Sequence, residues 1–308
     1  MSNDAVKELT RRLRDIVEAR LAALTPPADQ SPADLHRAMR HTLLAPAKRA
    51  RAILAMLAAK DLGADGALAL SSACALEMVH AASLILDDLP VMDNASLRRG
   101  LPANHTLFGE ATAILAAIAL LNRAYGVIAE DRSISAAARV RLADILSQSV
   151  GSEGLAAGQE QDLKWSPAKA TRFDVELVHA RKTAALFSAA AEMGAVVAGA
   201  GEDIVALMRN FGMKLGLAFQ ILDDLLDATA SRESAGKDVA QDGARPSLVF
   251  SIGLEAARRE AQIYVDEANA LIRAGCGEGA ALRRFAMALI AGLEHRLSPL
   301  REIREMHG

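Results

Sequence analysis

The stretch HAASLILDDLPVMDNASLRRG, residues 80–100, carries three aspartates at the end of a long apolar segment. Asp87 and Asp88 follow the apolar residues directly, and Asp93 comes after Pro90. Because the apolar residues before them have helical spacing, the first two carboxylates should lie at the C-terminal end of a helix. Carboxylates placed there face the negative end of the helix dipole and repel one another. We therefore expect a cation to bind at this point of the chain.

A second group of aspartates lies in FQILDDLLD, residues 219–227, again after an apolar helical pattern. Asp223 and Asp227 share one helical face, with Asp224 beside them. One such group could be a solvated helix terminus, but two groups, each ending an apolar helix, favour a metal site. Mg²⁺ fits because it binds a few carboxylates and completes its coordination with phosphate oxygens and water. Zn²⁺ does not fit, since no Cys accompanies either group.

Helical periodicity continues along the rest of the chain, whereas the alternating patterns of strands are scarce. Ala, Leu, Arg, Glu and Met, which favour helices, fill most positions. Ser31-Pro32 and Ser166-Pro167 each offer an N-cap residue followed by a first-turn proline. The pattern predicts helices, with room for breaks in the longer ones, near residues 4–24, 32–44, 48–62, 66–88, 104–130, 134–150, 168–198, 202–228, 246–274 and 279–306.

Two long polar segments, residues 158–172 and 229–247, interrupt this pattern. Neither is typical of a domain linker, because strongly apolar helices resume on both sides. Residues 111–129 and 183–200 are apolar nearly all round, which indicates central helices. The sequence therefore predicts one all-α domain over residues 1–308, a bundle of about ten or more helices. We interpret the second polar segment as a functional loop.

The charge balance excludes several kinds of partner. The 308 residues include 35 Lys and Arg against 38 Asp and Glu, a formal net charge of −3. No broad basic field is therefore available for nucleic acid or an anionic membrane surface. The most apolar run, residues 113–121, is far shorter than the roughly 20 residues of a spanning helix. The N-terminal residues lack the pattern of a signal peptide, and Cys74 and Cys276 lie far apart without metal-ligand spacing, as in a reduced chain. We therefore expect a cytoplasmic protein without stable membrane insertion.

Basic residues accompany the two groups of aspartates. Several lie in PAKRARAIL, at the predicted start of a helix whose N-terminus itself favours anions. His80 lies two helical turns before Asp87 on nearly the same face. Positive groups and metal ions beside six carboxylates indicate a polyphosphate ligand, while the glycine motifs of nucleotide-binding proteins are absent from the sequence. The basic residues are Lys48, Arg49, Arg51, Arg98, Arg99, Lys182, Lys237 and Arg245.

In these motifs the chain resembles the trans-isoprenyl diphosphate synthases, and among them the geranylgeranyl diphosphate synthases of bacterial carotenoid pathways. PAKRAR is similar to the family's G-G-K-R-x-R segment, and DDLPVMD with LRRG is similar to its first aspartate-rich motif. RKTAAL, FQILDDLLD, GKD and ARPSLV match the later motifs in order. The resemblance covers nearly the whole chain. It implies the isoprenoid synthase fold, with helices around a central active-site cavity, and a homodimer.

The resemblance also implies a role for each matching residue. Mg²⁺, as three ions when substrate is bound, would be held on the allylic diphosphate by the first Asp cluster, Asp87, Asp88 and Asp93, and by the second Asp cluster, Asp223, Asp224 and Asp227. The same diphosphate would be gripped by Arg98, Lys182, Lys237 and Arg245. Isopentenyl diphosphate would be held by the basic cluster, Lys48, Arg51, His80 and Arg99. Thr183 and Gln220 would lie along the allylic carbon chain near the developing cation.

The implied reaction joins isopentenyl diphosphate to an allylic diphosphate by ionisation, condensation and elimination. We expect geranylgeranyl diphosphate (C20) as the product and keep farnesyl diphosphate (C15) as the alternative. Ala82 and Ser83 are small and leave room for the growing chain, and the resemblance selects Ala82 as the residue that faces the tunnel for this chain, where a bulky side chain accompanies shorter products. A terpene cyclase is a further alternative, which the 3% content of aromatic residues disfavours. A non-catalytic subunit of a heteromeric synthase should lack an Asp cluster, and both clusters are intact.

Overall fold

The computed structural model describes residues 3–165, 171–234, 247–278 and 280–297. The backbone forms two compact units. The N-terminal unit comprises Ser2–Leu146 and Met193–Gly199, and the C-terminal unit comprises Ser147–Glu192 and Ala200–Gly308. Helices α7 (Ala136–Val150) and α10 (Ala185–Val197) contribute residues to both units. The all-α fold class predicted from the sequence is confirmed.

The N-terminal unit is built on α4 (Leu70–Asp87), in which residues 72–79 are all buried. A helix that is apolar on nearly every face must be enclosed by other helices. Accordingly, α4 packs against α6 (Glu110–Glu130), α3 (Ala50–Asp61) and α2 (Ala33–Leu43). The remaining elements are α1 (Asn3–Leu24), η1 (Gly66–Ala69), the strands β1 (Leu97–Arg98) and β2 (Leu101–Pro102), and α5 (Asn104–Phe108).

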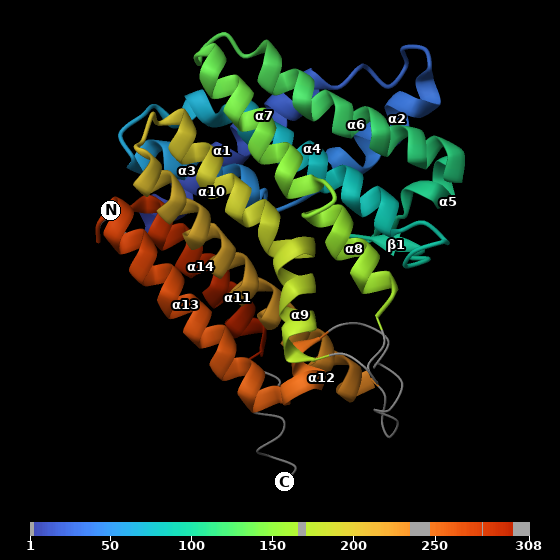
Figure 1. Ribbon diagram of the computed structural model, residues 1–308. Coiled ribbons are helices and arrows are strands. Elements are labelled where there is room, and N and C mark those ends of the chain that lie inside the picture. The colour runs from blue at the N-terminus through green and yellow to red at the C-terminus, as the bar shows by residue number, and fades with distance from the viewer. Residues whose placement is uncertain (1–2, 166–170, 235–246, 279, 298–308) are drawn as a thin grey trace. The chain divides into compact units, whose positions relative to one another are not determined.

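The C-terminal unit is built on α11 (Glu202–Ser234), which lies beside α13 (Leu254–Cys276) and α14 (Ala281–Leu297) in Figure 1. α11 also packs against η2 (Ala180–Ala184), a turn of π-helix between α9 (Arg172–His179) and α10. Glycines permit this contact, because a Cβ on Gly216 would lie 2.5 Å from the Cα of Ala184. The unit also contains α8 (Leu155–Leu163) and α12 (Leu248–Ile252).

Glycines with a positive φ divide two of the long predicted helices. Gly109, at φ 81°, separates α5 from α6, and Gly253, at φ 84°, separates α12 from α13. Glycine adopts this conformation without the steric cost that other residues incur. The helices predicted near residues 104–130 and 246–274 are therefore each broken by a sharp turn at glycine.

The structure corrects the sequence-based prediction in both polar segments. Helix α8 occupies the first part of the segment predicted at residues 158–172. It escapes detection because its buried residues, Gly158 and Gln159, make no apolar stripe. Helix α11 continues to Ser234, so the second polar segment begins inside a helix rather than in a loop.

Two of the predicted helix caps are also corrected, and a short hairpin appears that the sequence pattern does not predict. Helix α2 begins after an N-cap at Pro32 that makes no side-chain hydrogen bond, so Ser31 does not cap it. Helix α9 is capped by Thr171 through a reciprocal capping box with Asp174, whereas Ser166 lies outside the described residues. A short hairpin of β1 and β2, pairing Arg98 with Leu101, interrupts the helices after α4.

Two stretches, Gly66–Asp87 and Glu110–Glu130, are long and apolar enough to cross a membrane by length and composition alone. The longest uninterrupted apolar run, residues 113–121, is too short to span a membrane. Over a window of 18 residues, however, the mean hydropathy of both stretches reaches 1.6. The window in Gly66–Asp87 is 67% buried within the protein, as in a core helix, but the window in α6 is 39% buried.

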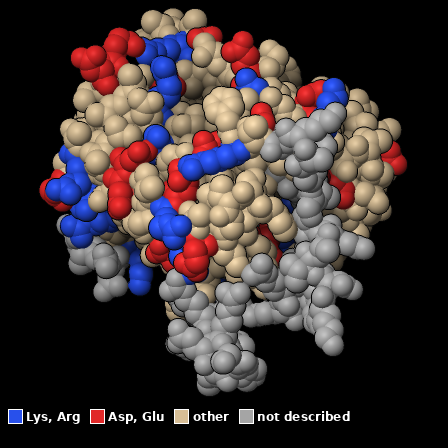
Figure 2. Space-filling view, turned by 60° about the horizontal axis from the view of Figure 1, so that its bottom comes forward, with Lys and Arg blue, Asp and Glu red and all other residues tan. Residues whose placement is uncertain are grey.

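On the face shown in Figure 2, Lys and Arg lie among Asp and Glu, in line with the small net charge.

Candidate active site

The first Asp cluster lies where α4 ends, as the sequence predicts. Asp87 is the last residue of α4 and Asp88 is its C-cap. The chain then turns back on itself, because the backbone N–H of Asp93 donates to the carbonyl of Asp87 at 2.9 Å. Asn94 adopts a left-handed conformation at φ 48°, and its N–H donates to the carbonyl of Leu89. This tight turn brings all three aspartates of the cluster to one end of the helix.

Arg98 supplies positive charge to this cluster. Asp88 is 2% exposed, and its Oδ1 accepts hydrogen bonds from Nε of Arg98 at 2.8 Å and from Nη2 of the same side chain. Burial would lower the pKa of Arg98, but the hydrogen bond to Asp88 and the charges of Asp87 and Asp93 outweigh it and raise this pKa. A protein side chain therefore offsets part of the repulsion that the sequence argument assigned to a metal ion.

The hairpin separates two consecutive arginines. Arg99 and Gly100 form its two-residue turn and have φ angles of 55° and 76°, the pair of positive values found in type I′ turns. Arg98, on β1, reaches Asp88, while Nη2 of Arg99 lies 3.2 Å from Nε2 of His80 on α4. The two arginines thus reach different neighbours, as their separate predicted ligands require.

Positive charge surrounds His80 in the basic cluster. Burial lowers the pKa of His80 well below its ordinary value, and the neighbouring Arg51, Arg99, Arg49 and Arg98 lower it further. His80 is therefore neutral near pH 7. Burial likewise lowers the pKa of Arg51 to about 10, with Arg99 adding to the shift and Glu77 opposing it. Cationic groups gathered around a neutral imidazole favour an anionic ligand at this place.

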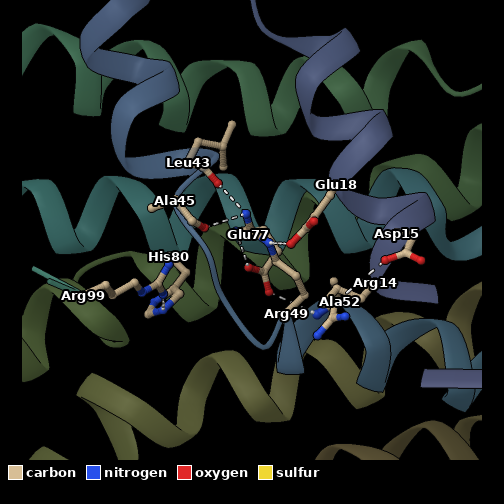
Figure 3. A network of polar contacts seen from close by, with 10 residues as sticks. All are labelled: Arg14, Asp15, Glu18, Leu43, Ala45, Arg49, Ala52, Glu77, His80 and Arg99. Atoms are coloured by element: carbon tan, nitrogen blue, oxygen red, sulfur yellow. Dashed lines mark hydrogen bonds and ion pairs between the residues drawn. The ribbon is translucent and has the colours of Figure 1, made fainter. Parts of the chain in front are cut away.

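The other basic residues near the start of α3 lie differently. Lys48 is exposed in the segment that leads into α3. Arg49, the next residue, is 3% exposed and turns inward to the carboxylate of Glu77 on α4. Figure 3 shows this inward network together with His80 and Arg99. Of the basic cluster, the structure brings Arg51, His80 and Arg99 together, and Lys48 is exposed.

The second Asp cluster lies within α11 and not at its end. The helix runs to Ser234, beyond Asp227, so the helix-dipole argument made from the sequence is wrong for this cluster. Asp227 is exposed and Asp223 is partly exposed, whereas only 10% of the Asp224 side chain is exposed. The i, i+4 pair of Asp223 and Asp227 therefore presents its carboxylates outward, and Asp224 faces its neighbours in the C-terminal unit.

A chain of polar contacts links Asp224 to two other predicted site residues. Oγ1 of Thr183 donates to Oε1 of Gln220 at 2.6 Å, and Nε2 of Gln220 donates to Oδ1 of Asp224 at 2.8 Å. Nε2 of His179 lies 3.4 Å from Oδ2 of Asp224. Burial raises the pKa of Asp224, although His179 and the hydrogen bonds from Gln220 and Ser247 oppose the rise. This arrangement fixes the Thr183 hydroxyl and the Gln220 amide relative to the second Asp cluster.

The π-helical turn η2 carries Lys182 and Thr183. Such turns are frequent at functional sites, because the extra residue changes where the side chains point. Nζ of Lys182 pairs with Oδ2 of Asp162 on α8. Gly158 allows α8 to approach, since a Cβ there would lie 2.5 Å from the backbone N of Lys182. The other two bases predicted for the allylic diphosphate, Lys237 and Arg245, lie outside the described residues.

The two residues predicted to limit chain length lie next to each other on α4. Ala82 is fully buried, and Ser83 is partly exposed with its hydroxyl donating to the carbonyl of His80. Ser83 lies one helical turn from His80 and one from Asp87, so the three share a face. This face, rather than the one that carries Ala82, is accessible along the C-terminal half of α4.

The chemistry of the two Asp clusters fits Mg²⁺. Both offer carboxylate oxygens, the hard ligands that Mg²⁺ prefers. Oδ2 of Asp224 is buried, and Nε2 of His179 lies 3.4 Å from it, so this carboxylate oxygen can accept a further partner. Within the described ranges, no three His, Cys, Asp or Glu side chains are arranged to hold a metal by themselves. An ion would need oxygens from water and substrate to complete its coordination, as Mg²⁺ commonly does.

The family resemblance gives no role to four residues that lie beside the predicted site residues. Asp162 pairs with Lys182, His179 approaches Asp224, and Arg49 pairs with Glu77 beneath the basic cluster. His179 has a local signal, because it precedes Lys182 within one helical turn. The other partners lie about 20 or more residues apart in the chain, and nothing in a single sequence pairs them.

The helical fold and the two Asp clusters define the isoprenoid synthase class. The structure resembles that of an FPP/GFPP synthase from Zymomonas mobilis with a TM-score of 0.82 and 30% identity, covering 94% of this chain and 100% of the other. It also resembles a Helicobacter pylori geranyltransferase complexed with magnesium and isoprenyl diphosphate, with a TM-score of 0.80 and 30% identity over 94% and 97% of the two chains.

Comparison of sequences identifies the family. The sequence model of polyprenyl synthetase matches residues 32–270. The chain is 40% identical to a geranylgeranyl diphosphate synthase of Pantoea ananas, over 94% of this chain and 93% of that protein. It is 38% identical to a farnesyl diphosphate synthase of Geobacillus stearothermophilus, over 86% of this chain and 91% of that protein. The chain belongs to the polyprenyl synthetase family, and the predicted resemblance is confirmed.

Proposed function

We propose that the chain is a short-chain prenyltransferase that joins isopentenyl diphosphate to allylic diphosphates. The observation that carries the proposal is the presence of two Asp clusters together with a basic cluster around a neutral His80. The reaction uses two diphosphate substrates that must not exchange places, and it therefore needs two chemically different anion sites. Metal-binding carboxylates suit the diphosphate that leaves, and bases alone suit the diphosphate that stays.

Different residues of the chain would bind the departing diphosphate and stabilise the allylic cation. The two Asp clusters would hold Mg²⁺, proposed as three ions, and the metal would supply charge stabilisation to the departing allylic diphosphate. Arg98 and Lys182 would turn from Asp88 and Asp162 to the same diphosphate, and we assign Lys237 and Arg245 to it as well. Thr183 and Gln220 would present their oxygens to the developing allylic cation.

Isopentenyl diphosphate would bind to Lys48, Arg51, His80 and Arg99 and attack the cation through its double bond. Holding both reactants in place converts a bimolecular step into an effectively unimolecular one. Loss of a proton to the released diphosphate then restores an alkene. The site must exclude water, since water would trap the cation before the new bond forms.

We propose geranylgeranyl diphosphate as the main product, with farnesyl diphosphate as the alternative. Two relatives named geranylgeranyl diphosphate synthase, from Pantoea ananas and Pseudescherichia vulneris, are 40% and 38% identical to this chain. The small side chains of Ala82 and Ser83 support the longer product.

Product analysis tests the proposal. The purified protein, Mg²⁺ and isopentenyl diphosphate are incubated separately with dimethylallyl, geranyl and farnesyl diphosphate, and chain lengths are read by mass spectrometry. We expect a C20 diphosphate, and no product when Mg²⁺ is chelated. Hydrocarbon formed without isopentenyl diphosphate would instead identify a cyclase. Absence of any prenyl diphosphate with all three starters would reject the proposal.

We also propose that the protein is a homodimer, as the family resemblance implies. Helix α6 supports this proposal because Ile114, Leu115 and Ile118 are 40%, 56% and 56% exposed on one helical face. Exposed apolar residues at this spacing are typical of a surface that packs against another helix. A second copy of α6 would cover them with a face of the same composition.

A further inference from the structure

We infer that the buried ion pair of Arg49 and Glu77 positions the basic cluster for isopentenyl diphosphate without touching that substrate. This inference rests on the proposed function, because it concerns how that substrate's site is held. The family resemblance assigns neither Arg49 nor Glu77 to a ligand, although Arg49 is one of the basic residues near the Asp clusters in the sequence. Both are 3% exposed, and both come from elements that carry members of the basic cluster.

Arg49 fixes the segment that carries Lys48. Its backbone is left-handed, with φ 52° and ψ 37°, at the N-cap of α3. This conformation is uncommon for a residue with a side chain and persists only where the surroundings hold it. Nη2 of Arg49 donates to the carbonyls of Leu43 at 2.8 Å and Ala45 at 3.1 Å. One guanidinium therefore ties the α2–α3 connection to the start of α3, with Lys48 between these points.

Glu77 fixes the first turn of α3, which carries Arg51. Its Oε2 accepts from Nη1 of Arg49 at 3.3 Å, and its Oε1 accepts from the backbone N of Ala52 at 3.4 Å. The first N–H groups of a helix have no partner within it, so the carboxylate satisfies one of them from a different helix. Glu77 is three residues before His80 on α4. One carboxylate thus links the turn of α3 that bears Arg51 to the turn of α4 that bears His80 (Figure 3).

Glu77 also offsets the mutual repulsion of the cationic groups. Its charge raises the pKa values of Arg51 and Arg99, whereas burial and the neighbouring arginines lower them. Glu18 on α1 adds a second carboxylate, 3.6 Å from Nε of Arg49. The negative charge therefore lies beneath the basic cluster on the protein side and leaves the cations to meet an anion. Loss of this charge should displace Arg51 and Arg99 in the empty site.

The test separates positioning from folding stability by using three variants. Glu77→Gln removes the charge of the carboxylate with almost no change in shape. Arg49→Lys keeps the positive charge but cannot make the several hydrogen bonds of the guanidinium to Glu77, Leu43 and Ala45. The double variant Arg49→Met, Glu77→Met replaces the pair by apolar side chains of similar size, which commonly restores stability lost on breaking a buried ion pair. The control Glu192→Gln breaks an ion pair between a buried carboxylate and a half-exposed arginine, in which Arg209 contacts Glu192 at 2.7 Å and 2.9 Å.

We expect each of the three variants to raise KM for isopentenyl diphosphate about tenfold or more, the scale seen when reacting groups are misplaced. KM for the allylic substrate and kcat should change much less. Glu192→Gln should lower the unfolding temperature, by less than Glu77→Gln does, and leave both KM values unchanged. The double variant should regain stability and still bind isopentenyl diphosphate weakly.

Recovery of the normal KM together with stability in the double variant would overturn the inference, as would an equal rise of both KM values in Glu77→Gln. Calorimetric titration of isopentenyl diphosphate into each variant keeps the test independent of turnover. A wild-type protein that forms no prenyl diphosphate would reject the proposed function. If the wild-type protein is active and Glu77→Gln binds isopentenyl diphosphate normally, only the positioning role of the ion pair is rejected.

Discussion

One carboxylate in each Asp cluster is already engaged by a protein group. Asp88 is bound by Arg98, and Asp224 lies between the Gln220 amide and the His179 ring. The Arg98 contact neutralises part of the first cluster before any ion arrives, and the Gln220 contact fixes the orientation of a carboxylate in the second. Binding of Mg²⁺ and diphosphate would then require Arg98 to exchange a carboxylate for a phosphate. Both anions can accept two parallel hydrogen bonds from the planar guanidinium. The engaged carboxylates hold the bases near the ligand and limit repulsion in its absence.

Removal of one carboxylate from either cluster is expected to stop catalysis. Asp87→Ala and Asp223→Ala should each lower turnover by about 10²- to 10³-fold, the loss typical when one electrostatic stabiliser of a transition state is removed. The dependence of the rate on Mg²⁺ concentration should weaken as well. Initial rates across a Mg²⁺ titration measure both effects. Asp203→Ala, an exposed residue in the first turn of α11, is the matched control and should leave turnover unchanged. Near-normal turnover in either cluster variant contradicts the two-cluster site.

Chain length should respond differently at two adjacent residues of α4. Ser83 shares the accessible face of α4 with His80 and Asp87, so Ser83→Tyr should shift the main product from C20 towards C15 with a small change in unfolding temperature. Ala82 is fully buried, and Ala82→Tyr should destabilise the fold by about 1–3 kcal/mol through overpacking.

The family resemblance selects Ala82 for control of chain length, and the burial of the two residues selects Ser83. Product chain lengths and unfolding temperatures of the two variants decide between them. If Ala82→Tyr gives C15 with an unchanged unfolding temperature, the growing hydrocarbon chain passes Ala82.

Among the elements, the long apolar helices are predictable from the sequence, and the short elements around the site are not. Helices such as α1, α2 and α3 begin and end within two residues of their predicted bounds because apolar spacing and flanking residues mark them. Helix α8 buries Gly158 and Gln159 and so has no apolar stripe, and strands of two residues are too short to show a period. The π-helical turn η2 needs one extra residue, for which the sequence has no signature.

The same distinction holds for the candidate site. The Asp clusters and most of the basic cluster are recognisable because their members lie within short motifs of fixed spacing. Glu77 and Arg49 are 28 residues apart, and Asp162 and Lys182 are 20 apart. Their pairing depends on which helices meet, which a single chain does not reveal. Roles of Lys237 and Arg245 stay predictions, since both lie outside the described residues.

The close approach of α8 to η2 should not tolerate a side chain at Gly158. A methyl group there would lie 2.5 Å from the backbone N of Lys182 and 2.9 Å from the carbonyl carbon of Arg181, so Gly158→Ala should separate the two elements. We expect a lower unfolding temperature and a higher KM for the allylic substrate, because Lys182 and Thr183 move with η2. Gly292→Ala in α14 meets open space and should stabilise the helix by up to about 1 kcal/mol. An unchanged KM in Gly158→Ala would mean that η2 is held by other contacts.

At the scale of the whole molecule, the exposed apolar face of α6 should govern assembly. Ile118→Glu places a charge in the middle of that face and is expected to convert a dimer into a monomer of 32.5 kDa, because an unpaired charge is costly to bury. Light scattering after size-exclusion chromatography measures the mass. Val140→Glu on α7, where the valine is 72% exposed, is the control and should leave the mass unchanged. A wild type that is already monomeric contradicts the proposed homodimer. That residues 1–308 act as one domain also stays a prediction.

The π-helical turn has a consequence for how this chain can vary in evolution. A turn of π-helix is equivalent to one codon inserted into an α-helix, and α9 and α10 continue in the α-helical conformation on either side of it. Deletion of a single codon there would close the turn into ordinary α-helix, and the flanking helices would keep their buried faces. Lys182 or Thr183 would be redirected by about 100°, the rotation between successive helical residues. Selection against such deletions would therefore act on catalysis before it acted on folding.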